Sequence, residues 1–487
     1  MTAEPTTATP ASADLTQPLA ISTDVRVDLD PTVLAARLPA GFRLGAATSS
    51  YQIEGAEEAD GRGLSIWDTF SRAPGRVHLG QTGAVAIDHY HRLEEDVALM
   101  ADLGLESYRF SVAWPRIIPD GDGAVEPRGL AFYTRLVDLL IQAGIEPVVT
   151  LYHWDLPQAL QDRGGWANRE TVHAFARYAR VVQEALGEKV KVWTTINEPW
   201  CAAYLGYGNG VHAPGITDPR TAMRAAHHLL LAHGVATQQM REAAPEFSYG
   251  IVPNLYPVYP ATQDPADVAA ADTIDALQNR QWLDPLLLGR YPEEITRTQR
   301  RFGADSAILP GDLEQIAQPL DLLGVNYYSQ HHVAAEPNPV PRYNTEHPGS
   351  EHVRWVRGNG PLTDMEWTIE PHGLRDILIR LSRDYSAPPL FVTENGAAFP
   401  DVVADDGSIQ DADRRQFLAA HISAVVEAIE AGANVTGYTA WSLFDNYEWA
   451  FGYAKRFGIV HIDYETLQRT PKASAHWYRD LIAARRR

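Results

Sequence analysis

Cysteine is almost absent from this sequence of 487 residues, since Cys201 is the only one. An internal disulfide is therefore impossible, and so is a zinc or iron–sulfur site built from several cysteines. Lysine is also scarce, and the 41 lysines and arginines are outnumbered by 62 acidic residues, which gives a net charge of −21. We do not expect so acidic a protein to bind nucleic acid or an anionic membrane surface through its bulk charge.

Long apolar runs are missing as well. No stretch of about 18 apolar residues occurs, so no transmembrane helix is predicted. The N-terminus, M-T-A-E-P-T-T-A-T-P, lacks the basic start and apolar core of a secretory signal, and we expect a cytoplasmic location. Aromatic residues are plentiful, with 12 Trp, 21 Tyr and 13 Phe, which excludes a chain that is disordered throughout.

Composition changes at two places along the chain. Residues 1–35 are rich in Thr, Ala, Pro and Asp with little periodicity, and are predicted to form a disordered or loosely attached tail. Residues 335–362 are rich in Pro and polar residues and are predicted to form a long surface loop. No other segment resembles a linker, so residues 36–487 are predicted to form one domain.

Within that domain, short apolar runs alternate with helical patterns. Helices are predicted over residues 93–104 and 130–144, each of which ends in Gly. Strands are predicted over residues 43–50, 107–112, 147–153, 192–197, 249–255, 322–328, 389–395 and 435–442. Eight such strands alternating with helices favour a single-domain (β/α)8 TIM barrel with long βα loops. A doubly wound sheet is the alternative, but no G-x-G-x-x-G follows a strand, and G-Y-G-N-G at 206–210 has the wrong spacing.

The carboxyl ends of the predicted strands are polar or aromatic. The residues found there are Gln52, His153, Asn197, Glu198, Asn326, Tyr328, Glu394 and Trp441. In a (β/α)8 barrel this is the face that carries the active site. The sequence therefore predicts that these side chains lie around one pocket.

Two glutamates in this set suggest a reaction. Glu198 and Glu394 end the fourth and seventh predicted strands. Two carboxyl groups across a pocket suit acetal cleavage, because one protonates the leaving oxygen while the other attacks or stabilises the anomeric carbon. An ionised Glu394 would hold the proton on Glu198 by repulsion and would itself need a cation, for which Arg109 on the second strand is suitably placed.

The sequence also resembles glycoside hydrolase family 1, the β-glucosidase-like retaining enzymes, and most closely its bacterial type. The resemblance extends from about Leu38 to Tyr478. It rests on six motifs in the order of the family: L-G-A-A-T-S-S-Y-Q-I-E-G (44–55), Y-H-W-D-L-P (152–157), T-I-N-E-P (195–199), G-V-N-Y-Y (324–328), V-T-E-N-G (392–396) and W-S-L-F-D-N-Y-E-W (441–449).

Roles for individual residues follow from this resemblance. It implies that Glu198 is the general acid/base and Glu394 the nucleophile, with Arg109 and Tyr328 keeping the nucleophile ionised and aimed. It also implies that Asn197 hydrogen-bonds the sugar 2-hydroxyl. The other positions that match substrate-binding residues are Gln52, His153, Asn326, Trp367, Trp441, Glu448 and Trp449.

The implied activity is hydrolysis of terminal non-reducing β-D-glucosyl residues from small β-glucosides or cello-oligosaccharides, through a covalent glycosyl-enzyme. No metal or organic cofactor is implied, because the acid and the nucleophile are both side chains. The sequence leaves open the preference among glucose, galactose and fucose, the natural aglycone and whether the chain forms a homo-oligomer.

Other functions fit less well. Binding proteins on this fold lack one of the two glutamates, and thioglucosidases carry Gln in place of the acid. A phosphoglycosidase is expected to carry Ser at the position of Glu448, and a metal-dependent lyase would need a ligand cluster that H-H-L-L-L-A-H (227–233) does not supply. Two positions depart from the family pattern: Leu44, where an aromatic residue is common, and Glu366, where Gly is frequent.

Overall fold

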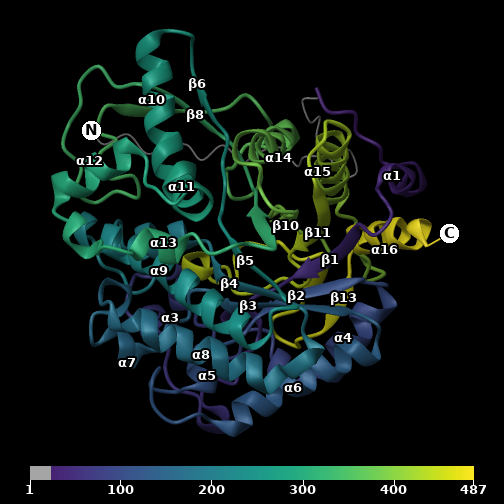
Figure 1. Cartoon of the computed structure of the whole chain (residues 1–487). Coiled ribbons are helices and arrows are strands. Elements are labelled where there is room, and N and C mark those ends of the chain that lie inside the picture. Colours follow the sequence, from purple (N-terminus) through teal and green to yellow (C-terminus); the bar gives the residue numbers. More distant parts are fainter. Residues whose placement is uncertain (1–23, 487) are drawn as a thin grey trace, which may run out of the picture.

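The computed structural model describes residues 24–486 and contains a closed barrel of eight parallel strands (Figure 1). The order around the barrel is β1-β11-β10-β7-β5-β4-β3-β2, so each strand neighbours the next in sequence and β11 closes onto β1. The strands are β1 (Arg43–Ala47), β2 (Ser107–Ser111), β3 (Glu146–Tyr152), β4 (Val192–Asn197), β5 (Ser248–Val252), β7 (Leu322–Asn326), β10 (Leu390–Asn395) and β11 (Val435–Trp441). All eight overlap the predicted ranges, and the predicted TIM barrel is confirmed.

The barrel strands are buried along almost their whole length. Every residue of β4 and β10 is buried, as expected for parallel strands with packed side chains on one face and helices on the other. β3 and β4 pair in register from Val148 opposite Val192 to Tyr152 opposite Ile196. The paired residues are all β-branched or aromatic, the types enriched in strands, which explains why these strands could be predicted from the sequence.

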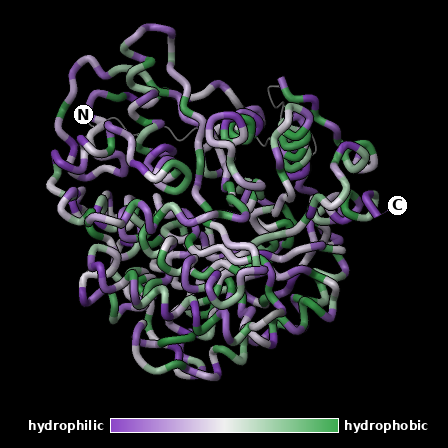
Figure 2. Tube along the Cα trace, viewed as in Figure 1, coloured by the Kyte–Doolittle hydropathy of each residue, from purple (hydrophilic) through white to green (hydrophobic). Residues whose placement is uncertain are grey.

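Helices surround the barrel. The longer ones are α4 (Leu93–Asp102), α6 (Pro127–Gln142), α8 (Glu170–Leu186), α9 (Pro219–Ala243), α10 (Pro265–Asp275), α11 (Gln281–Leu288), α12 (Glu293–Phe302), α14 (Pro371–Tyr385), α15 (Ala412–Glu430) and α16 (Ala473–Arg485). Short helices are α2 (Ser50–Ile53), α3 (Ile66–Arg72), α5 (Trp114–Ile117), α7 (Gln158–Gln161) and α13 (Asp312–Ile316). Figure 2 shows hydrophobic and hydrophilic residues alternating within single outer helices, as expected where one face packs on the barrel. No helix among residues 24–486 has the length and apolar character needed to cross a bilayer.

The predicted tail ends differently in the structure. Helix α1 (Pro31–Arg37) begins inside the predicted range, with Asp30 accepting a hydrogen bond from the backbone N–H of Thr32. Leu34 is fully buried, and α1 packs against α16, next to the C-terminus (Figure 1). Proline occupies the first helical position, where it favours helix initiation. The helix was not predicted because the composition of the surrounding residues is typical of a tail. Residues 1–23 of the predicted tail lie outside the described residues.

The predicted loop at 335–362 is only partly a loop. Its first residue ends β8 (His331–Ala335), and β9 (Val353–Val356) lies within it. These two strands pair antiparallel, while β6 (Val258–Pro260) runs parallel to β8. This three-stranded sheet lies beside α10 (Figure 1). The other small sheet pairs β12 (Val460–Ile462) with β13 (Arg469–Pro471).

Candidate active site

Both predicted catalytic glutamates line one cavity of about 580 Å³. Glu198 directly follows β4 and Glu394 lies near the end of β10, so the cavity opens at the carboxyl ends of the strands. Six other predicted residues line it: His153, Tyr328, Trp367, Trp441, Glu448 and Trp449. The remaining four, Gln52, Arg109, Asn197 and Asn326, are buried and hydrogen-bond to lining residues.

Glu198 is held from both sides of its carboxyl group. Oε1 accepts a hydrogen bond from Nδ2 of Asn326 at 2.8 Å, and Oε2 accepts one from Sγ of Cys201 at 3.0 Å. The backbone N–H of Glu198 donates to the carbonyl oxygen of Val252 at 2.7 Å, which ties the residue to β5. Its side chain is therefore fixed in direction at the point where the chain leaves the barrel.

Glu394 has a different environment. Oε1 accepts from the Arg109 guanidinium at 2.5 Å, and Oε2 accepts from the Tyr328 hydroxyl at 2.7 Å. Arg109 is 1% exposed and Glu394 is 2% exposed, so this ion pair is shielded from water. Each oxygen thus faces a donor, one of them charged, which suits an ionised carboxylate.

A chain of amide groups connects the two glutamates. The Arg109 guanidinium also donates to Oδ1 of Asn197 at 2.7 Å, and Nδ2 of Asn326 donates to the same oxygen at 3.0 Å. Nδ2 of Asn197 in turn lies 3.2 Å from Nε2 of His153. Burial, and then the charge of Arg109, hold the pKa of His153 well below its usual value, so this imidazole is neutral and can accept the bond.

These surroundings raise the pKa values of two carboxyl groups in the cavity. Burial, reinforced by the negative charge of Glu394, raises the pKa of Glu198 to about 7. Burial and the charges of Glu394 and Glu198 raise the pKa of Glu448 to about 8. Near neutral pH the cavity therefore combines a carboxyl group that can hold a proton with one that is paired to a cation.

Tryptophans line another part of the cavity, and a buried glutamine lies behind its wall. The rings of Trp441 and Trp449 each stack on His153, at centroid distances of 5.7 Å and 5.9 Å. Nε2 of Gln52, on α2, donates to the carbonyl oxygen of Tyr447 at 2.9 Å and lies 3.5 Å from Oε2 of Glu448. The ring of Trp367 lies beside that of Tyr328, with 5.4 Å between the ring centroids. Flat apolar rings next to polar groups are the combination that recognises a pyranose ring and its hydroxyls.

The backbone of the V-T-E-N-G motif comes close to the next strand. A Cβ atom on Gly396 would lie 1.6 Å from the carbonyl oxygen of Trp441. Only glycine can occupy this position without displacing Trp441, which explains the final residue of the motif in physical terms.

Several residues around the cavity have strained backbone conformations. Trp154, Glu198, Glu366 and Trp449 all line it and have positive φ values of 78°, 45°, 60° and 52°. Such conformations are costly for residues other than glycine and gather at functional sites. The strain supports the assignment of this cavity as the site.

Some lining residues were not predicted from the sequence. Tyr256 lies just beyond the range predicted for the fifth strand, and the same rule of strand ends could have found it. Trp200, His331, His347 and Trp355 also line the cavity. His347 and Trp355 carried no sequence signal, because residues 335–362 were predicted to form an irregular loop.

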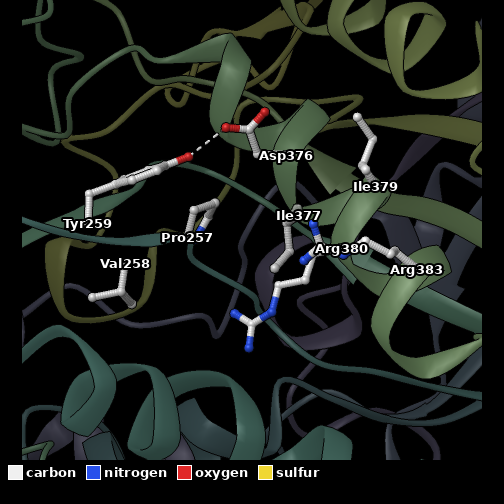
Figure 3. A pocket seen from close by; sticks show the side chains of 8 residues that line it. All are labelled: Pro257, Val258, Tyr259, Asp376, Ile377, Ile379, Arg380 and Arg383. Atoms are coloured by element: carbon white, nitrogen blue, oxygen red, sulfur yellow. Dashed lines mark hydrogen bonds between the residues drawn. The ribbon is translucent and has the colours of Figure 1, made fainter. Parts of the chain in front are cut away.

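A second hollow, of about 330 Å³, lies between the β6 segment and α14 (Figure 3). Its charged groups already have partners: the Tyr259 hydroxyl donates to Asp376 at 2.8 Å, and Arg380 pairs with Asp275 at 2.5 Å. It shares no lining residue with the central cavity. Its polar groups are therefore occupied by structural contacts.

One cluster among residues 24–486 has the geometry of a metal site. The ligand atoms of Asp401, Asp445 and His461 lie within 4.8 Å of one another. The Lys472 ammonium, however, pairs with Asp401 at 2.6 Å and with Asp445 at 2.8 Å. A buried lysine thus supplies the positive charge that this cluster needs.

Comparison with known proteins identifies a glycosyl hydrolase family whose model matches nearly the whole chain. A family model described as "Glycosyl hydrolase family 1" matches residues 34–487. The thermostable β-glucosidase B of Thermobispora bispora is 53% identical over 449 residues, which is 91% of this chain and 90% of that protein.

Solved structures show the same similarity. The psychrophilic β-glucosidase of Micrococcus antarcticus has a TM-score of 0.90 at 47% identity and covers 93% of this chain and 99% of its own. The β-glucosidase of Thermotoga maritima, in complex with deoxynojirimycin, has a TM-score of 0.88 at 44% identity and covers 92% of this chain and 99% of its own.

Proposed function

The chain belongs to glycosyl hydrolase family 1, and from this premise we propose that it is a retaining β-glucosidase. It removes terminal non-reducing β-D-glucosyl residues from small β-glucosides and short oligosaccharides through a covalent glycosyl-enzyme. The observation that carries the proposal is the contrast between two buried carboxyl groups in one cavity. Glu198 has a pKa raised to about 7, whereas Glu394 is paired with Arg109 at 2.5 Å.

In the first step the Glu394 carboxylate attacks the anomeric carbon and forms a carbon–oxygen bond. The bond from that carbon to the aglycone oxygen breaks, and Glu198 gives its proton to this oxygen. Arg109 and Tyr328 keep the attacking carboxylate ionised and aimed by occupying one oxygen each.

In the second step Glu198 acts as the base. Once Glu394 is esterified it has no charge, so one of the causes that raise the pKa of Glu198 disappears. The ionised Glu198 takes a proton from water, the water oxygen attacks the anomeric carbon, and the bond to Glu394 breaks. Sugar and free enzyme result, with the configuration retained after two displacements.

The rest of the cavity holds the sugar. Glu448 and Gln52 bind neighbouring outer hydroxyls, and Trp441 lies under the apolar face of the ring. Asn197 is held by Arg109 in a position to bind the 2-hydroxyl, where a hydrogen bond strengthens in the transition state. A sugar that lacks a matching hydroxyl leaves these buried groups unpaired and is rejected. Trp367 forms a platform for the aglycone or second sugar.

The mechanism is tested with the Glu394→Gly variant. It should lose hydrolysis of an aryl β-glucoside, and added azide should restore cleavage and give an α-glucosyl azide, because the small anion fills the vacated space. NMR of the wild-type reaction should show β-glucose first. If the folded wild-type enzyme released α-glucose first, the retaining mechanism would be contradicted.

A further inference from the structure

Cys201, the single cysteine of the chain, touches the residue proposed as the acid. It begins a short π-helical turn, η6 (Cys201–Leu205), three residues after Glu198. Its Sγ lies 3.0 Å from Oε2 of Glu198, and the residue is 7% exposed and lines the central cavity.

The two oxygens of Glu198 are not equivalent. A guanidinium can only donate, so Oδ1 of Asn197, which faces Arg109, must be an acceptor. Nδ2 of Asn326 donates to that oxygen at 3.0 Å and is therefore the amide nitrogen. The same NH₂ group donates to Oε1 of Glu198, while Thr393 donates to Oδ1 of Asn326 at 2.7 Å and fixes the amide orientation.

An NH₂ group cannot accept a hydrogen bond, so a proton on Oε1 would point at a donor. The acid form of Glu198 consequently carries its proton on Oε2, the oxygen next to Cys201. When Glu198 is ionised, the Cys201 thiol can donate a hydrogen bond to Oε2. When Oε2 carries the proton, the thiol can turn away or act as a weak acceptor. Burial, and then the charge of Glu198, hold the pKa of the thiol well above its usual value, so Cys201 remains an S–H donor.

We infer that Cys201 is a positioning residue: Asn326 leaves Oε2 as the proton-carrying oxygen of Glu198, and the thiol beside Oε2 holds that oxygen in place and stabilises the ionised form between the two steps. The inference rests on the proposed function. Other groups also act on Glu198: Glu394 from β10, Arg109 from β2, Glu448 from the segment after β11, Tyr328 beyond β7 and Tyr256 beyond β5. None of these is altered by a substitution at position 201.

The pH dependence of kcat/KM for an alkyl β-glucoside tests this role, because a poor leaving group requires the proton of Glu198. In Cys201→Ala the ionised form loses a donor, and the alkaline limb should move up by about half a pH unit. In Cys201→Ser the hydroxyl is a stronger donor, and the limb should lie at or below the wild-type position. The pH of the alkaline limb should therefore increase in the order Ser, Cys, Ala. If one variant fails to fold, the other can still be compared with the wild-type enzyme.

The outcomes separate this inference from the proposed function. In correctly folded variants, a Cys201→Ala limb that does not lie above the wild-type limb, or a Cys201→Ser limb that does, would overturn the role of Cys201. The Glu198→Gln variant is the reference, since it should abolish the alkaline limb altogether. If that limb persisted in Glu198→Gln, the assignment of the acid, and with it the proposed function, would fail instead.

Discussion

At the scale of single residues, the loss of the Glu198 proton should reduce kcat/KM by an amount that depends on the leaving group of the substrate. In Glu198→Gln, kcat/KM for cellobiose or an alkyl glucoside should fall by about 10³-fold, within the usual range for general acid catalysis. A dinitrophenyl glucoside needs little protonation and should lose far less in its first step. Steady-state and burst kinetics on both substrates measure the difference. Equal losses would show that Glu198 does not act as the acid.

Glu366 shows how a backbone conformation can explain a departure from a family pattern. Its φ is 60°, in the left-handed region where glycine is favoured, and its exposed side chain lines the mouth of the cavity beside Trp367. The resemblance gives Gly as the frequent residue here, and the structure supplies the physical reason.

Glu366→Gly should therefore stabilise the protein by about 1 kcal/mol, because the strain of a left-handed non-glycine residue is removed. Glu366→Ala is the matched control: it removes the same charge but keeps the strain, and should not stabilise. Thermal unfolding of the three proteins measures the effect. A similar rise in Tm for Ala and Gly would mean that charge, and not φ, is responsible.

At the scale of elements, buried ion pairs fix the segment that carries Glu448. Lys472, between β13 and α16, is fully buried and pairs with Asp445, which follows β11 and precedes Glu448 by three residues. Arg456 pairs with the same aspartate at 2.7 Å. These contacts connect the C-terminal helix to one wall of the cavity.

Replacing Lys472 with Met should cost about 3–5 kcal/mol of stability, since it removes the fully buried cation that two buried carboxylates share. The matched control is Lys189→Met, which removes a salt bridge to Asp138 from a lysine whose side chain is 47% exposed. That change should cost at most about 1 kcal/mol. Denaturant or thermal unfolding gives both values, and equal losses would contradict a structural role for the buried network.

The elements differ in how well the sequence revealed them. The barrel strands were predictable because strands buried on both faces are continuous apolar runs, as in β10. Helix α1 and the β8–β9 pair were not, because tertiary contacts stabilise them within sequences that are locally typical of tails and loops.

The site divides in a similar way. Polar residues at strand ends, such as Glu198 and Glu394, could be placed around one pocket from the topology alone. The contact of Cys201 and the positive φ of Glu366 could not, since each depends on local geometry that no periodicity encodes. The interior of the barrel is thus specified by pattern, whereas its rim is specified by individual contacts.

At the scale of the whole molecule, two sets of buried groups give stability opposite dependences on pH. Burial lowers the pKa of seven histidines: His153, His212, His228, His233, His331, His347 and His421. These bind protons more readily in the unfolded chain, so their contribution to stability rises with pH up to about 6.5. Asp155, Glu198 and Glu448 have pKa values raised to about 7, 7 and 8. These bind protons more readily in the folded chain, so their contribution falls as pH rises from their ordinary values of 3.8, 4.5 and 4.5 up to those folded values.

Below about pH 6.5 the histidines outnumber the carboxyl groups, and unfolding should take up protons. Above about pH 7 the carboxyl groups still titrate, together with His461, whose pKa is raised by its hydrogen bonds to Asp401 and Asp445, and unfolding should release a smaller number of protons. We therefore expect Tm to be highest near pH 7, to fall steeply toward pH 5.5 and to fall gently toward pH 8.5, as measured by calorimetry across about this range. Glu448→Gln removes the group with the highest of these carboxyl pKa values, about 8. It should flatten the alkaline side and make the acid side steeper, because Glu448 binds its extra proton in the folded chain over the whole range from its ordinary value of 4.5 up to about 8. A Tm that rises toward pH 5.5, or an acid side that flattens in Glu448→Gln, would show that the buried histidines do not control stability in this range.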